Sequence, residues 1–98
     1  MDGAPLGGTE LAALLARVPQ WQVVDGALQR SWRFANFHRT MAFVNAVAWI
    51  AHREDHHPDL QVGWGRCTVR YCTHSVGGLS LNDFICAAHL DALGAAAP

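Results

Sequence analysis

The 98-residue chain contains no lysine, and only 15% of its residues are charged. Its formal net charge of -1 gives no basic field that would attract a nucleic-acid backbone. No apolar run approaches the roughly 18 residues needed to cross a bilayer. The start lacks a basic leader and a small-residue cleavage site. We therefore expect a cytoplasmic protein that binds neither nucleic acid nor membrane.

Cysteine is also sparse, and Cys67, Cys72 and Cys86 show no C-x-x-C spacing. An odd number of cysteines without this spacing fits reduced thiols, which we expect to act as small buried hydrophobic residues. Hydrophobic residues make up 51% of the chain, enough for one core at this length. The sequence thus predicts a single domain over residues 1–98, with residues 1–8 and 95–98 frayed.

Hydrophobic periodicity predicts helices that alternate with two β-hairpins, an α+β element order of α-β-β-α-β-β-α. Thr9 is expected to cap the first helix and Pro19 to stop it. Asp25-Gly26 is a strong signal for the first hairpin, and the second is expected to turn at Gly65-Arg66. The expected strands are 21–24, 28–34, 60–64 and 67–73.

A long helix is predicted from Phe37 to His52, and 11 of the 15 residues from Phe37 to Ala51 are apolar. A helix that is apolar nearly all round is buried on both sides, so we expect a homo-oligomer, either a dimer or a tetramer. The alternative is that small alanines fill an ordinary half-buried helix. Pro58 disfavours helical geometry at His57, so the helix should end near Asp55.

The last helix is expected to begin at a Ser80 cap, with Asp83 three residues on as a capping-box variant. Gly94 is expected to end it. Its buried stripe is predicted to consist of Leu81, Phe84, Ile85 and Ala88.

Four of the six histidines lie between residues 52 and 74, namely His52, His56, His57 and His74. One interpretation is a metal site, because His52 and His56 lie four apart and could share a cation with a third histidine. The metalloprotease pattern is absent, since Arg53 follows His52 where that pattern requires glutamate. The sequence therefore gives a metal little support.

A second interpretation is metal-free acid–base catalysis on a small polar ring. His56 and His57 would point to different sides of an extended segment, and His74 would approach from the neighbouring strand, on the face away from the helices. An imidazole gives or takes a proton readily near neutral pH, so the group offers both an acid and a base. A third interpretation is solvated loop histidines.

The segment from His52 to Asp83 resembles the signature of the pterin-4a-carbinolamine dehydratases. His56-His57-Pro58 is followed by Trp64 after five intervening residues, by His74 after nine more and by Asp83 after eight more. The resemblance implies four antiparallel strands with three helices on one face. It also implies dehydration of 4a-hydroxytetrahydrobiopterin to quinonoid dihydropterin without metal or bound cofactor, which links the protein to an aromatic amino acid hydroxylase.

The resemblance further implies that His56, His57 and His74 are catalytic, one imidazole protonating the departing hydroxyl and another taking the ring-nitrogen proton. Which histidine does which stays open. Trp21 also fits a buried anchor, Asp83 also fits a helix cap, and His52 replaces an acid of the animal enzymes. The residues assigned to substrate binding are Trp21, His52, Pro58, Thr73 and Asp83.

Similar proteins also act as noncatalytic modules, such as a transcriptional coactivator and a carboxysome assembly factor. A module of this kind would dock through the helix at about 37–52. The presence of all three site histidines argues against a purely noncatalytic role, because a binding module has no chemical need of them.

Overall fold

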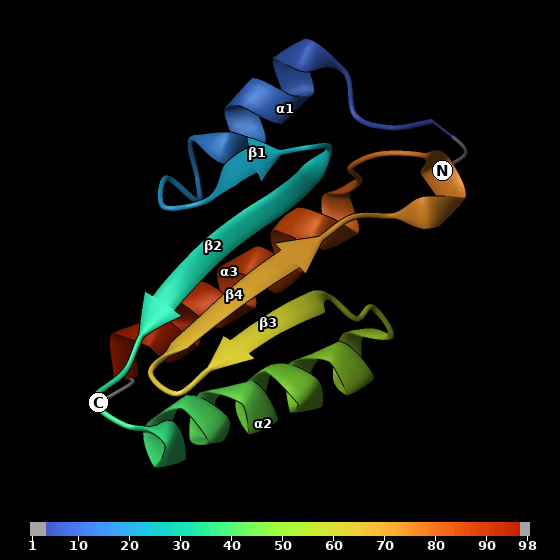
Figure 1. Ribbon diagram of the computed structural model, residues 1–98. Helices are drawn as coiled ribbons and strands as arrows, with labels where there is room; N and C mark the ends of the chain where they lie inside the picture. The colour runs from blue at the N-terminus through green and yellow to red at the C-terminus, as the bar shows by residue number, and fades with distance from the viewer. Residues whose placement is uncertain (1–3, 97–98) are drawn as a thin grey trace.

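A computed structural model describes the backbone of residues 4–96 and the side chains as far as Leu93. A four-stranded antiparallel sheet has the strand order β1-β2-β4-β3, and Figure 1 shows α3 running behind its central strands while α2 lies beside β3. The predicted α+β class and element order are confirmed. The elements are α1 (Gly8–Leu15), β1 (Gln22–Val24), β2 (Ala27–Arg33), α2 (Phe37–Glu54), β3 (Asp59–Gly63), β4 (Arg66–Tyr71), the 3-10 helix η1 (His74–Val76) and α3 (Leu81–Ala96).

The sheet register separates a covered face from an open one. Leu28 of β2 is paired with Tyr71 of β4, and both are fully buried. Because side chains alternate along a strand, the next positions, such as Gln29 opposite Arg70, occupy the open face. The core therefore lies on one side of the sheet. Its buried side chains include Trp32, Phe43, Val47, Val69, Phe84, Ala87 and Leu90.

Local backbone signals place most chain reversals where the sequence predicts them. Asp25 and Gly26 have φ values of 50° and 79°, as a two-residue hairpin turn with the matching twist requires. Asn36 caps α2 by accepting a hydrogen bond from the Arg39 N–H at 2.9 Å. Asp55 ends α2 in the left-handed region at φ 52°, three residues before Pro58.

Several predicted boundaries are wrong. α1 begins at Gly8, so Thr9 lies inside the helix; Gly7 precedes it and donates its N–H to Glu10 Oε1 at 3.1 Å. The second hairpin turns at Trp64-Gly65, because Gly63 and Arg66 are already paired. α3 continues past Gly94 to Ala96, since glycine is tolerated in a helix at a modest cost in stability.

The predicted frayed ends are described only in part. Leu6 donates its N–H to the Leu79 carbonyl at 2.9 Å, which ties the segment before α1 to the loop before α3. Residues 95 and 96 belong to α3. Residues 1–3 and 97–98 lie outside the described residues.

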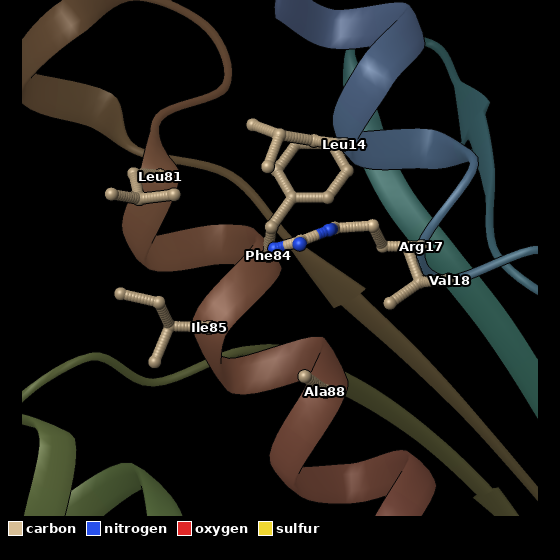
Figure 2. Close-up of a pocket in the computed structure, with 7 residues that line it drawn as sticks. All are labelled: Leu14, Arg17, Val18, Leu81, Phe84, Ile85 and Ala88. Carbon is tan, nitrogen blue, oxygen red and sulfur yellow. The ribbon is translucent and has the colours of Figure 1, made fainter.

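The buried face of α3 is rotated from the predicted one. Phe84 is buried as expected, whereas Leu81 is 54% exposed and Ile85 is 37% exposed. α3 is apolar on several sides, so periodicity alone could not choose between faces. The exposed residues line an apolar pocket of about 160 Å³ where Leu14 of α1 and Arg17, just after that helix, meet Phe84 (Figure 2). The stripe that faces the core is Asp83, Cys86, Ala87 and Leu90.

The cysteines are free thiols, and Cys67 and Cys86 are buried as predicted. Burial raises the pKa of the Cys86 thiol to about 11, so this side chain is neutral at physiological pH. Cys72 is only half-buried. Between residues 4 and 96, no helix combines the length and hydrophobicity that a membrane span requires.

Candidate active site

The centre of the candidate site is Asp83, a carboxylate in the first turn of α3 with no exposed surface. Its Oδ1 lies 2.6 Å from His56 Nε2. Its Oδ2 accepts hydrogen bonds from Thr73 Oγ1 at 2.9 Å and from the Ser80 N–H at 2.8 Å. A buried carboxylate is tolerated only when its oxygens are paired in this way. Asp83 thus joins three segments that are distant in the sequence.

The hydrogen-bond directions follow from this carboxylate. Because a carboxylate only accepts, His56 carries its proton on Nε2 and its Nδ1 is the nitrogen left for other partners. The Thr73 hydroxyl already donates to Asp83, so the Ser80 hydroxyl, 2.7 Å away, donates to Thr73. Asp83 therefore fixes both the tautomer and the orientation of the His56 ring.

Tyr71 forms the wall behind His56. The two rings are stacked, with centroids 5.7 Å apart and an interplanar angle of 11°. Tyr71 is fully buried at the end of β4, and burial raises the pKa of its hydroxyl well above the usual range, so it is neutral. Packing on one side and Asp83 on the other hold the His56 side chain, which is 14% exposed.

The sequence predicted His74 on a strand, and this prediction is wrong. β4 ends at Tyr71 and Thr73 pairs with Gly78 in an isolated bridge, so the chain turns into η1 at His74. Strand alternation therefore does not set the direction of this side chain. His74 is exposed, and its Nε2 lies 3.9 Å from Cys72 Sγ. His74 directly follows Thr73, whose hydroxyl is bonded to Asp83.

The other residues near the histidine pair differ in their surroundings. His57 is exposed and directly follows His56, and Pro58 is half-buried at the entry to β3. His52 is exposed on α2, where its ring lies 6.1 Å from that of Trp49. The hydrogen bonds to Asp83 therefore bring together His56, Thr73 and their neighbours, and His52 has no bond to this network among those the structure gives.

Trp21 is an anchor of the core. It is 4% exposed, its indole N–H donates to Asp91 Oδ1 at 2.7 Å, and its ring is 5.5 Å from that of Trp32. Arg30 also donates to Asp91 Oδ1, at 2.5 Å, which explains why an arginine occupies the covered face of β2. Tyr71 lies between Trp21 and His56, and the ring centroids of Trp21 and Tyr71 are 6.0 Å apart.

The metal alternative finds no geometric support in the part of the chain that the structure describes. Over residues 4–96 no three histidine, cysteine, aspartate or glutamate side chains are placed to hold a metal ion. Asp83 occupies His56 Nε2, so Nδ1 is the only nitrogen of this ring that could serve as a ligand.

A pocket of about 530 Å³ adjoins the site, and Thr73, Ser75 and Val76 contribute to its lining. This volume is in the range of small-molecule pockets. Of the predicted site residues only Thr73 lines it, beside Ser80 and the segment before α1. The three site histidines line neither this pocket nor the apolar one in Figure 2.

Two residues that support the candidate site were not assigned to it by the sequence analysis. Tyr71 was given no role there, and its ring stacks on that of His56. Ser80 was expected only as a cap, although its hydroxyl bonds Thr73. The register of β4 and the fold of η1 create both contacts, and neither is visible as a local pattern.

Comparison with known proteins places most of the chain in one family. The family model for pterin 4 alpha carbinolamine dehydratase matches residues 4–93. A relative from Xanthomonas axonopodis pv. citri is 64% identical over 85% of this chain and 72% of its own length, and one from Chromobacterium violaceum is 53% identical over 92% and 83%. Both carry a provisional assignment as pterin-4-alpha-carbinolamine dehydratases. The chain belongs to the pterin-4a-carbinolamine dehydratase family.

Solved structures confirm the fold. A crystal structure of a transcriptional coactivator/pterin dehydratase from Brucella melitensis superposes with a TM-score of 0.86 at 31% identity, covering 91% of this chain and 97% of the other. A pterin dehydratase-like RuBisCO assembly factor of the alpha-carboxysome shares the fold at a TM-score of 0.61 and 23% identity, covering 74% and 84%.

Proposed function

We propose that this protein dehydrates 4a-hydroxytetrahydrobiopterin, a pterin-4a-carbinolamine, to quinonoid dihydropterin and water. The observation that carries the proposal is the Asp83-centred network, which holds His56 and Thr73 and leaves the adjacent His57 and His74 exposed. Membership of the dehydratase family supports the same reaction. The proposed function uses no metal and no bound cofactor.

The reaction needs one proton delivered and one removed. An imidazolium donates its proton to the 4a-hydroxyl, the C–O bond breaks and water leaves. The lone pair of the adjacent ring nitrogen forms the new C=N bond, and a neutral imidazole takes the proton of that nitrogen. Positioned general acid–base groups contribute about 10² to 10⁴-fold to such a step. Exposed histidines at 57 and 74 are free to exchange these protons with solvent between turnovers.

The cellular setting is part of the proposal. Free thiols at Cys67, Cys72 and Cys86 support a reducing compartment, which we take to be the cytoplasm. There the protein would regenerate the pterin of an aromatic amino acid hydroxylase. His52 and Pro58, next to the histidine pair, and Trp21, behind Tyr71, are proposed to shape the pterin site.

Stopped-flow spectroscopy tests the reaction directly. A hydroxylase generates the 4a-hydroxytetrahydropterin, and its dehydration is followed with and without the purified protein in the presence of a metal chelator. We expect dehydration to accelerate in proportion to protein concentration and to be insensitive to the chelator. A dehydration rate equal to the spontaneous one would refute the enzyme, and acceleration abolished by chelator would refute the metal-free mechanism.

A second candidate function, noncatalytic docking, is favoured by exposed aromatic side chains on α2. Trp49 is 64% exposed and Phe37 is 48% exposed. The coactivator description of the Brucella melitensis relative supports the same possibility. We propose that in this chain the partner that docks on α2 is a second copy of the same protein, so that α2 forms the interface of a homo-oligomer.

Replacing Trp49 by aspartate should dissociate the oligomer. Buried tryptophans are frequent interface hot spots worth about 2 kcal/mol or more, and a charge at that position adds a desolvation penalty. Light scattering coupled to size exclusion should give a dimer or tetramer for the wild type and a monomer for Trp49→Asp. Trp64→Asp, at a tryptophan that is 68% exposed, is the matched control and should keep the wild-type mass. A monomeric wild type would contradict the prediction.

A further inference from the structure

Charge is unevenly distributed along this nearly neutral chain. No aspartate or glutamate occurs from residue 26 to 53 or from residue 60 to 82, and these two stretches hold six of the seven arginines. β2 with most of α2, and β4 with all of β3 except its first residue, Asp59, come from these stretches. The end of the sheet where β2 stops and β3 turns into β4 is therefore basic, although the net charge is -1.

A pocket of about 370 Å³ lies at this basic end. Arg33 at the end of β2 and Arg66 at the start of β4 are direct partners across the open face of the sheet. Like charges placed opposite each other destabilise a strand pair unless something neutralises them. The lining contains no acidic residue; it consists of Arg33, Phe34, Gly63, Trp64, Gly65 and Arg66.

The backbone that carries these side chains is held firmly. Phe34 donates its N–H to the Gly65 carbonyl at 2.8 Å, and Thr40 Oγ1 donates to the Trp64 carbonyl at 2.8 Å. A Cβ at Gly65 would lie 2.8 Å from the Phe34 oxygen, so only glycine allows this approach. Arg66 Nη2 lies 3.9 Å from the place of a Cβ at Gly63, which shows that the guanidinium extends over that glycine.

We propose that this pocket binds a small phosphate monoester that carries a planar ring, a ligand of the mononucleotide class. Two guanidinium groups present forked donors that match the oxygens of one phosphate, and the phosphate relieves their mutual repulsion. Trp64, 68% exposed beside them, offers an aromatic face for stacking the ring. The volume is in the range of pockets that hold small molecules.

This pocket is separate from the histidine site. Arg66 begins β4 and Tyr71 ends it, which places the two sites about 16 Å apart at 3.3 Å per residue along the strand. Figure 1 shows the turn between β3 and β4 at the opposite end of the sheet from the loop that contains η1. The inference therefore does not depend on the proposed dehydratase reaction.

Isothermal titration calorimetry tests the proposal with AMP, adenosine and inorganic phosphate as probes. We expect AMP to bind at least about tenfold more tightly than either fragment, because only AMP engages both the arginines and Trp64. Arg66→Gln should weaken AMP binding by about 10- to 100-fold, as expected for a lost charged hydrogen bond. Trp64→Leu should bring the affinity for AMP down to that for phosphate.

Arg17→Gln is the matched control, since it removes the same charge from an exposed arginine in the pocket between α1 and α3. It should leave AMP binding unchanged, and circular dichroism should show all variants folded. Absence of AMP binding, equal affinity for AMP and adenosine, or equal losses in Arg17→Gln and Arg66→Gln would each overturn the proposal.

Discussion

Replacing His74 by alanine is expected to lower the rate of carbinolamine dehydration by about 10² to 10⁴-fold, the usual contribution of a general acid or base. His74 is exposed in η1, and within the described part of the chain its side chain is bonded only to Cys72 Sγ, at 3.9 Å, so the fold should not depend on it. The thermal midpoint should therefore stay within a few degrees of the wild-type value. Single-turnover stopped-flow measurements with generated carbinolamine give the rate.

His57→Ala should produce a loss of similar size, because His57 is exposed and follows the fixed His56. The pH dependence separates the two roles: losing the acid removes the limb at higher pH, and losing the base removes the limb at lower pH. His38→Ala, at an exposed histidine in the first turn of α2, is the control and should turn over at the wild-type rate. Full activity in both His57→Ala and His74→Ala would exclude these histidines as the catalytic pair.

The hairpins and the long helix could be predicted because their signals are local. Asp25-Gly26 needs no tertiary contact to favour a tight turn, and Pro58 limits α2 through the backbone of the residue before it. The face of α3 could not be predicted in this way. Leu81 and Ile85 are as hydrophobic as the residues that are buried, and packing against the sheet decides which of them faces inward.

The candidate site shows the same limit. The sequence spacing indicated which residue types matter, yet it could not show that Asp83 serves both as the partner of His56 and as the acceptor for Ser80 N–H. Strand periodicity misplaced His74, because β4 stops at Tyr71 and a short 3-10 turn follows. The resemblance to a family supplied the chemistry, and the structure supplied the connections between the groups.

Asp83→Ala is expected to lower the free energy of unfolding by about 3 to 5 kcal/mol, because each buried donor left without its acceptor costs about 1 to 3 kcal/mol. The change leaves His56, Thr73 and the Ser80 N–H without their acceptor. Water cannot easily replace the carboxylate, because Asp83 has no exposed surface. Urea denaturation followed by circular dichroism gives this free energy. Asp59→Ala removes an exposed carboxylate and should change it by less than about 0.5 kcal/mol.

A double-mutant cycle shows whether Asp83 couples the segments or only caps α3. If Asp83 links β4 to α3 through Thr73, then Thr73→Val should cost less in the Asp83→Asn background than in the wild type, with a coupling energy of about 1 kcal/mol. Additive effects would show that the cap alone accounts for the stability. Non-additive effects would show that Asp83 couples β4 to α3. If Asp83→Asn also slows dehydration, then Asp83 orients His56 for catalysis as well.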